Sequence, residues 1–288
     1  MRQFLRRLLS LVTVPTASPA LVRLELTPAF EAAAKHHSTA LLTAPAPELD
    51  LTLVMLDGGA AADVDRGRFD RLWRSASTKL VADGAANQLH DRLGGAAREA
   101  ALPDLILGDL DSLRADVAAF YRARGVRVET DADQDTHDFE KCVRWLEERA
   151  RREPSARRPT VVAHGALRGR LDHMLAQLDV QFGAAERGAL ERLLLLSEHS
   201  VAFVLGPGKH VIHANPDADD GSCGLLPLGG RCESVRTRGL RWDLDGSRAL
   251  QFGAFISSSN ALAAPTIAIE TSGPLLWTSG LRGGGVSA

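Results

Sequence analysis

The sequence contains few cysteines, no long apolar run and no excess of charge of either sign. Its three cysteines, Cys142, Cys223 and Cys232, are odd in number and lack the spacing of metal ligands. They favour a reducing compartment and unpaired thiols. No apolar stretch approaches the roughly 20 residues that a membrane-spanning helix needs. A net charge of −2 gives no reason to expect a nucleic acid partner. We therefore expect neither a membrane nor nucleic acid among its partners.

What the chain does contain is the composition of a globular protein, with 45% hydrophobic and 24% charged residues. Its 288 residues allow one large domain or two of ordinary size. Three segments differ in pattern: a leader at 1–47, an α/β region at 48–197 and a β-rich region at 198–288. We expect the last two segments to form separate domains.

The expected leader is basic at its start. Its first 24 residues carry four arginines and no acidic residue. Leucines and a phenylalanine lie between these arginines, which is the composition of an organelle transit peptide. A disordered leader without a targeting role explains the same composition equally well. We expect a cytoplasmic protein, with a mitochondrial or other organellar location as the alternative if the leader is a targeting signal.

Strands and helices are expected to alternate in the second segment. Short apolar runs predict strands at 51–56, 79–82, 104–107, 126–130 and 160–163. Amphipathic spacing predicts helices at about 69–75, 113–124, 138–151 and 169–182. This alternation is typical of a parallel, doubly wound α/β sheet. Right-handed crossovers would then gather the loops after the strands along one edge of the sheet.

The third segment is expected to be all β. Its short β-rich runs lie at 201–205, 210–213, 232–237, 249–252 and 266–270, and clusters of Gly, Pro, Asn and Asp separate them. No long amphipathic helix interrupts them. The pattern predicts a β-sandwich domain.

One stretch carries the first chemical signal. The apolar run 105–107 stops at Gly108 and is followed by Asp109-Leu110-Asp111-Ser112. Two aspartates at this spacing in an extended turn can point the same way and share one hard cation, whereas a helix would separate them by about 200°. The alternative is that Asp109 is a turn residue and Asp111 only caps the next helix.

Acidic residues also follow other strands of the predicted sheet. Asp83 ends the second strand, an aspartate-rich run occupies 131–138, and a glycine-rich run with Arg168 and Arg170 follows the fifth strand. Carboxylates gathered in one crevice repel each other unless a counter-charge is present. Magnesium with nucleotide phosphates would neutralise them, and arginine with backbone N–H groups suits an anion. The sequence therefore predicts phosphoryl-type transfer from a nucleotide, unless these loops form only an acidic, solvated edge.

Eight motifs in this order and spacing carry a resemblance to a known family. They are 82–87 (ADGAAN), 103–112 (PDLILGDLDS), 133–142 (DQDTHDFEKC), 165–173 (GALRGRLDH), 207–210 (PGKH), 239–242 (GLRW), 257–260 (SSSN) and 270–277 (ETSGPLLW). Over nearly all of residues 48–280, the chain resembles thiamine pyrophosphokinases of the eukaryotic type.

The resemblance implies an enzyme that transfers a pyrophosphoryl group from ATP to the thiamine hydroxyl and produces thiamine diphosphate and AMP. It also implies an α/β domain followed by a β-sandwich, in a homodimer with sites between subunits. By motif match, the residues that would hold Mg²⁺ and the polyphosphate are Asp83, Asp109, Asp111 and Asp138. The nucleotide side would be contacted by Gln134, Arg170 and Lys141. Thiamine would be bound by Asp172, Trp242, Ser257, Ser259 and Asn260.

Three positions depart from the family pattern. Ala85 replaces a glycine, His137 stands where threonine is usual, and Ser258 replaces a threonine. Ala85 and His137 motivate an alternative, a catalytically weakened protein that binds thiamine or a nucleotide. Another metal-dependent nucleotide transferase with the D-x-D motif is a second alternative, which gives no role to Trp242 and Asn260.

Overall fold

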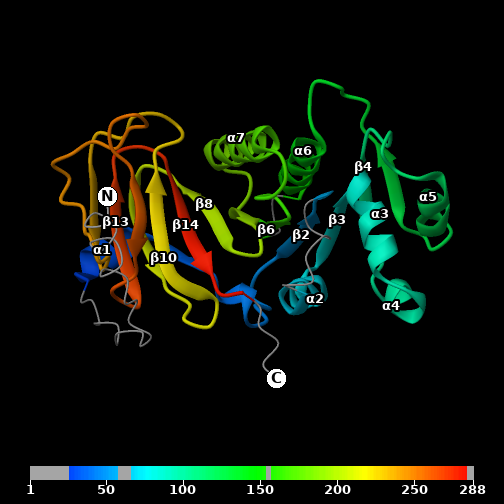
Figure 1. The fold of residues 1–288 in the computed structure, drawn as a ribbon, viewed down its shortest axis with the longest axis horizontal. Helices are drawn as coiled ribbons and strands as arrows, with labels where there is room; N and C mark the ends of the chain where they lie inside the picture. Colours follow the sequence, from blue (N-terminus) through cyan, green and yellow to red (C-terminus); the bar gives the residue numbers. More distant parts are fainter. Residues whose placement is uncertain (1–25, 58–65, 154–156, 284–288) are drawn as a thin grey trace, which may run out of the picture.

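The structure is a computed structural model that describes residues 26–57, 66–153 and 157–283. An α/β part and a β-sandwich lie side by side (Figure 1). One ten-stranded sheet runs through both parts, in the order β12-β10-β14-β8-β7-β6-β2-β3-β4-β5. A four-stranded sheet, β1-β9-β13-β11, completes the sandwich.

The α/β part contains six parallel strands: β2 (Leu51–Met55), β3 (Thr78–Ala82), β4 (Leu105–Gly108), β5 (Arg127–Thr130), β6 (Thr160–His164) and β7 (Arg192–Leu196). Its helices are α2 (Arg66–Ser75), α3 (Asp83–Arg92), α4 (Gly95–Ala100), α5 (Ala115–Arg122), α6 (Asp138–Arg152) and α7 (Leu171–Arg187). Every residue of the central strands β2 and β6 is buried, as is typical of a parallel sheet covered on both faces. The predicted doubly wound sheet is confirmed.

The strand order of this part locates a binding edge. From β2 the chain proceeds outward through β3, β4 and β5, and then returns to form β6 on the other side of β2. The order therefore reverses between β2 and β6. In open α/β sheets, ligands bind beyond the carboxyl ends of the strands at such a reversal.

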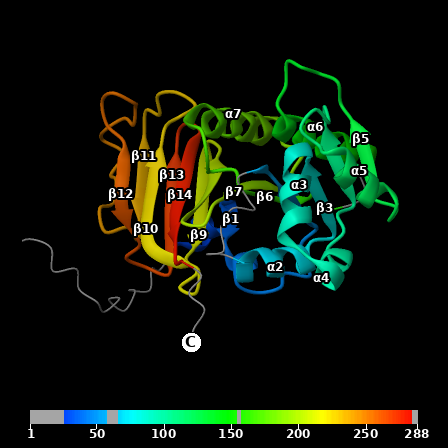
Figure 2. The same cartoon turned by 45° about the vertical axis from the view of Figure 1, so that its right-hand side comes forward.

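The sandwich grows directly from the α/β sheet. Strand β8 (Ser200–Leu205) pairs antiparallel with β7 and continues the sheet into β14 (Leu275–Leu281), β10 (Asp219–Leu226) and β12 (Ser257–Ala261). The second sheet contains β1 (Lys35–Ser38), β9 (Gly208–His213), β13 (Thr266–Thr271) and β11 (Val235–Arg238). Figure 2 shows the two sheets facing each other. The predicted β-sandwich is confirmed, whereas the division of the chain at residue 197 stays a prediction.

Residues 28–42, which fall within the expected leader, form regular elements of the fold. This stretch forms α1 (Pro28–Ala33), β1 and the 3-10 helix η1 (Ala40–Leu42). Strand β1 runs parallel to β9, and the side chains of Leu41 and Leu42 are buried. Strand pairing and apolar burial thus anchor the segment in the fold. The arginine-rich residues 1–25 lie outside the described residues.

Several elements were not predicted from the sequence. Besides α1, β1 and η1, they are α3, α4, β7, β10, β12 and β14. The run at 249–252, expected to be a strand, forms only the isolated bridges Cys232↔Leu250 and Gln251↔Phe255.

The cysteine and membrane expectations can be compared with the structure. All three cysteines are free and buried, which confirms the prediction of unpaired thiols. Over the described part of the chain, no helix combines the length and the apolarity needed to cross a membrane.

Candidate active site

Three carboxylates from two neighbouring strand ends converge. Asp83 is the first residue of α3, directly after β3, and Asp109 and Asp111 lie in the turn after β4. Since β3 and β4 are parallel neighbours, their carboxyl ends meet at the same edge of the sheet. One oxygen of each carboxylate lies within 4.8 Å of the others.

The turn between the two strand-end aspartates has an unusual backbone. Leu110 has φ +66°, a left-handed conformation that side chains with a Cβ seldom adopt. The Asp111 N–H donates to Asp109 Oδ1 at 3.1 Å, and the Ser112 hydroxyl donates to Asp111 Oδ1 at 2.8 Å. The left-handed residue thus places both carboxylates on one side of the turn, as the D-x-D spacing predicted.

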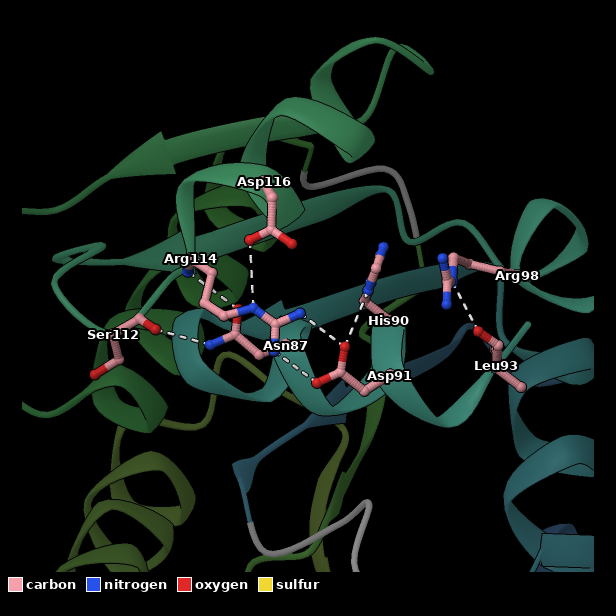
Figure 3. Close-up of polar contacts among 8 residues, drawn as sticks. All are labelled: Asn87, His90, Asp91, Leu93, Arg98, Ser112, Arg114 and Asp116. Carbon is pink, nitrogen blue, oxygen red and sulfur yellow. Dashed lines mark hydrogen bonds and ion pairs between the residues drawn. The ribbon is translucent and has the colours of Figure 1, made fainter. Parts of the chain in front are cut away.

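Asn87 of α3 fixes this turn (Figure 3). Its Nδ2 donates to the Ser112 carbonyl at 2.7 Å, and its Oδ1 accepts from the Arg114 N–H at 3.1 Å. The Arg114 guanidinium then returns to α3 and donates to both oxygens of Asp91, at 2.6 and 2.7 Å. Asn87 and Arg114 therefore hold the two aspartates of the turn against the helix that begins with Asp83.

Asp138 and Lys141 lie next to the three carboxylates. Asp138 opens α6 on the other side of Gly108, where an added Cβ would lie 2.5 Å from Asp83 Cβ and 2.9 Å from Asp138 Oδ1. Only a glycine leaves room for both carboxylates. Lys141 is 1% exposed, and its Nζ lies 3.7 Å from Asp109 Oδ2 and 3.5 Å from Asp138 Oδ1. The structure thus brings the four predicted carboxylates and Lys141 together.

The electrostatics of this group favour a cation. Asp83 is fully buried, and no hydrogen bond of ordinary geometry satisfies its carboxylate oxygens. Burial, followed by repulsion from Asp138, raises the pKa of Asp83 to about 6. Burial also raises the pKa of Asp138, while the Asp111 N–H lowers the pKa of Asp109. An all-oxygen donor set with a buried, unpaired carboxylate fits Mg²⁺, which prefers carboxylate ligands.

The sequence analysis missed Asp57 as a site residue. It follows β2 beside the strand-order reversal, and both of its oxygens would lie 2.8 Å from a Cβ added to Gly84 in the first turn of α3. Its charge also raises the pKa of Asp138. Asp57 therefore belongs to the acidic edge. The available signal was its position directly after the first predicted strand.

The predicted nucleotide-side residues are arranged less closely. Gln134 donates from Nε2 to Asp109 Oδ2 at 3.3 Å, so it joins the acidic group. Arg170 and Asp172 pair with each other at 3.1 and 2.5 Å, and both side chains are exposed. Arg168 pairs with Glu198 at 3.2 Å, which leaves Arg170 as the more accessible guanidinium of the loop after β6.

The predicted thiamine residues of the sandwich differ in exposure. Trp242 is 55% exposed, and Ser259 is also exposed, with φ +56°. In contrast, Ser257 and Asn260 are buried. Only Trp242 and Ser259 of this set are therefore open to a ligand.

These sandwich residues lie far from the carboxylates of the same chain. Strand β12, which carries three of them, is eight strand positions from β4 in the ten-stranded sheet. At the usual strand spacing this corresponds to roughly 38 Å along the sheet. Figure 1 shows the sandwich and the β3–β5 end on opposite sides of the molecule.

Comparison with known proteins identifies the family of the chain. The family model for the thiamin pyrophosphokinase catalytic domain matches residues 69–189, and that for the vitamin B1 binding domain matches residues 209–276. Thiamine pyrophosphokinase 2 of Arabidopsis thaliana is 34% identical over 221 residues, which cover 73% of this chain and 80% of that protein. The chain belongs to the thiamine pyrophosphokinase family.

Solved structures share the fold of this thiamine pyrophosphokinase family member. Yeast thiamin pyrophosphokinase superposes with a TM-score of 0.77 at 22% identity, over 92% of this chain and 96% of that one. The Candida albicans protein gives 0.76 at 19% identity, over 90% and 96%. At these identities the likeness is one of fold.

The structure accommodates two departures from the thiamine pyrophosphokinase pattern. Ala85 lies inside the first turn of α3, where no left-handed backbone is needed and the missing glycine has no cost. His137 is the N-cap of α6, and its Nδ1 accepts from the Glu140 N–H at 3.4 Å. The histidine thus takes the capping role that a threonine hydroxyl can fill.

Proposed function

We propose that this protein transfers a pyrophosphoryl group from ATP to the hydroxyl of thiamine, producing thiamine diphosphate and AMP. The observation that carries the proposal is the convergence of Asp83, Asp109 and Asp111 at the binding edge, in a chain of the thiamine pyrophosphokinase family. In this reaction the thiamine oxygen forms a bond to the β-phosphorus, and AMP leaves. Such a transfer depends mainly on positioning and on neutralising the phosphate charge.

Mg²⁺ is the proposed metal, held by Asp83, Asp109, Asp111 and Asp138. When bound, it supplies positive charge that neutralises both the carboxylates and the polyphosphate. The buried, unpaired Asp83 supports this assignment. Lys141 is proposed to hold Asp109 and Asp138 in place through its two ion pairs and to lie next to the phosphates when they bind.

The nucleotide and thiamine contacts are proposed from the family motifs together with exposure. Gln134 and Arg170 would contact ATP. Asp172 would accept a hydrogen bond from the aminopyrimidine of thiamine once it separates from Arg170. Trp242 would stack on the cationic thiamine ring, since an exposed indole face attracts cations.

A homodimer with active sites between subunits is also proposed. The carboxylates and Trp242 lie roughly 38 Å apart along the sheet of one chain, too far for one thiamine molecule to reach both. Large apolar side chains are exposed on α7, at Leu171 and Leu175, and on the sandwich, at Trp242 and Phe252. Exposed apolar groups of this kind are suited to a subunit interface. A twofold axis would bring the carboxylates of one chain to the Trp242 of its partner.

The location is proposed to be cytoplasmic, with an organelle as the alternative if the arginine-rich residues 1–25 act as a targeting signal. A fluorescent fusion of the full chain and one that lacks residues 1–25 would distinguish the two.

The activity is tested with the purified full chain, ATP, Mg²⁺ and thiamine by following AMP and thiamine diphosphate together. We expect both products in equal amounts. Asp111→Asn should abolish turnover without lowering the melting temperature. Asp217→Asn is the control, because its exposed side chain lies in the sandwich, away from the carboxylates and from the residues that hold them. Thiamine binding without turnover in the wild type would instead support a weakened binding protein.

A further inference from the structure

The side chain of Asn260 is hydrogen-bonded to the main chain of Trp242. Asn260 Oδ1 accepts from the Trp242 N–H at 3.2 Å, and Nδ2 donates to the Trp242 carbonyl at 2.9 Å. A single amide thus binds both polar groups of one residue, the pairing that a neighbouring β-strand usually provides. Asn260 is 4% exposed, so its side chain has little contact with solvent or with a ligand.

The Asn260 side chain binds the backbone of Trp242 at the point where backbone-to-backbone pairing of this segment ends. The segment 239–241 pairs with the last residue of β12 and the residue after it, through the Leu240↔Leu262 bridge and the 2.8 Å hydrogen bond from the Arg241 N–H to the Ala261 carbonyl. Two residues before Ala261, Ser259 adopts φ +56° and leaves the extended conformation. The polar groups of Trp242 therefore pair with the Asn260 side chain.

Ser257 holds Asn260 in turn. Its Oγ accepts from Asn260 Nδ2 at 3.2 Å, and the Ala261 N–H donates to Asn260 Oδ1 at 2.8 Å. Oδ1 therefore has two donors around it and Nδ2 two acceptors, which fixes the orientation of the amide. Ser257 and Asn260 are both buried, whereas the indole of Trp242 is exposed.

We propose that Asn260 is a positioning residue that holds the Trp242 indole as a preformed platform for thiamine, with Ser257 fixing Asn260, and that neither residue contacts thiamine. This inference rests on the proposed function. It changes the roles expected of both residues, which the family resemblance assigned to the thiamine contact.

A fixed platform matters because the indole is otherwise poorly held. Trp242 is 55% exposed, and the guanidinium carbon of Arg241 lies 4.8 Å from the centre of its ring. One indole face is therefore next to a cation, and a cationic thiamine ring must take the other face at a defined angle. Ordering a mobile side chain during binding reduces affinity, so a preformed indole raises it.

The test measures steady-state kinetics of Asn260→Ala in the full chain. We expect the KM for thiamine to rise about tenfold, the cost of immobilising one or two side chains on binding, while the KM for ATP stays within twofold. Ser257→Ala should raise the thiamine KM in the same direction by a smaller factor. Ser258→Ala is the matched control, because that side chain is exposed on the same strand and makes no bond to the amide.

Asn260→Asp gives a readout that a merely structural role would not produce. A carboxylate keeps the acceptor for the Trp242 N–H but loses the donor to the Trp242 carbonyl. A protonated carboxyl keeps an acceptor for the Trp242 N–H and has one O–H, which can restore the bond to the Trp242 carbonyl but not the second bond to Ser257. We therefore expect the thiamine KM of Asn260→Asp to approach that of the wild type as the pH falls, while Asn260→Ala shows no such recovery.

Tryptophan fluorescence measures the mobility of the Trp242 side chain directly and does not depend on enzyme turnover. The difference between each variant and its Trp242→Phe counterpart isolates the emission of this indole. Time-resolved anisotropy should show faster local motion of Trp242 in Asn260→Ala than in the wild type. A folded Asn260→Ala with an unchanged thiamine KM and unchanged anisotropy would overturn the inference. A wild type that produces no AMP, but whose Trp242 still becomes mobile in the variant, would instead refute the proposed function alone.

Discussion

At the scale of single residues, the buried charge of Asp83 lowers the stability of the metal-free protein. Folding raises the pKa of Asp83 from 3.8 to about 6. The carboxyl therefore stabilises the fold while it is protonated, below pH 4, and this contribution is lost as the pH rises through 6. We predict that Asp83→Asn stabilises the metal-free protein at pH 7.5 by roughly 1–3 kcal/mol, with no gain at pH 4, while it abolishes turnover.

Thermal unfolding in EDTA at the two pH values measures this effect. Mg²⁺ should raise the melting temperature of the wild type at pH 7.5 and leave that of Asp83→Asn unchanged. An Asp83→Asn protein that is less stable than the wild type at pH 7.5 would contradict the prediction, because it would mean that the carboxylate is stabilised without metal.

The left-handed Leu110 gives a second prediction at this scale. Glycine adopts φ +66° without strain, whereas a β-branched residue in this region is costly. Leu110→Gly should keep activity and its Mg²⁺ dependence. Leu110→Ile should lose about 1–2 kcal/mol of stability and require more Mg²⁺ for half-maximal rate. Mg²⁺ titrations of activity, together with urea unfolding, check both variants; equal Mg²⁺ requirements would show that the turn does not position Asp109 and Asp111.

The sequence was informative about which residue types form the site and less so about how each is used. Strand ends predicted Asp83, Asp109 and Asp111 because parallel strands bring their carboxyl ends together, and the structure gathers them. The burial of Ser257 and Asn260 could not be predicted, since it depends on which strand edge the segment 239–242 covers. The motif at 257–260 indicates the region that is expected to bind thiamine, but the contact with segment 239–242, remote in sequence, decides which of its side chains are exposed.

At the scale of elements, β1 makes stability depend on pH. His37 of β1 is buried, and its Nε2 lies 3.0 Å from Nδ1 of His210 in β9. Burial, followed by repulsion from His210, lowers the pKa of His37 to about 3. Below pH 6.5 the His37 imidazole is protonated in the unfolded chain but stays neutral in the folded protein. The free energy of unfolding therefore falls as the pH drops below 6.5. Between pH 7 and 5 we expect this residue to cost about 2 kcal/mol.

Urea unfolding of the wild type and His37→Gln at pH 7 and 5 checks this prediction. The variant should be less stable at pH 7 but should lose less stability on acidification. His199→Gln is the control, because its side chain is 69% exposed and should leave the pH dependence unchanged. Parallel pH dependences for wild type and His37→Gln would show that β1 is not responsible.

Elements with clear periodicity were predicted, and those defined by their neighbours were not. β2 and β6 are uninterrupted apolar runs buried on both faces, so the sequence alone indicates them. β10 contains Asp, Gly and Ser, β12 is mostly Ser, and the register of their pairing shifts between Cys223 and Leu225. Such strands form because a partner edge supplies hydrogen bonds, and this partner is remote in sequence. The same holds for β1, whose partner β9 lies about 175 residues away.

At the scale of the whole molecule, the long sheet explains why one chain would be inactive. The strand that carries Asn260 and the strand that precedes Asp109 are eight positions apart, so each site would take its carboxylates from one subunit and its indole from the other. Asp111→Asn and Trp242→Ala proteins should each be nearly inactive at low thiamine concentration. Equal mixtures that exchange subunits should recover about a quarter of wild-type activity, because half of the dimers are mixed and each mixed dimer has one intact site.

Light scattering of the wild type and activity of the mixtures test this arrangement together. A dimer whose mixtures gain activity after subunit exchange supports shared sites. A dimer whose mixtures stay inactive would place both halves of each site within one chain, which requires thiamine binding away from Trp242. The control is the double variant Asp111→Asn with Trp242→Ala, mixed with an equal amount of wild type. In each mixed dimer, one site then lacks Asp111 and the other lacks Trp242, so neither site is intact. After subunit exchange, activity should fall to about a quarter of that of the same total amount of wild-type dimer.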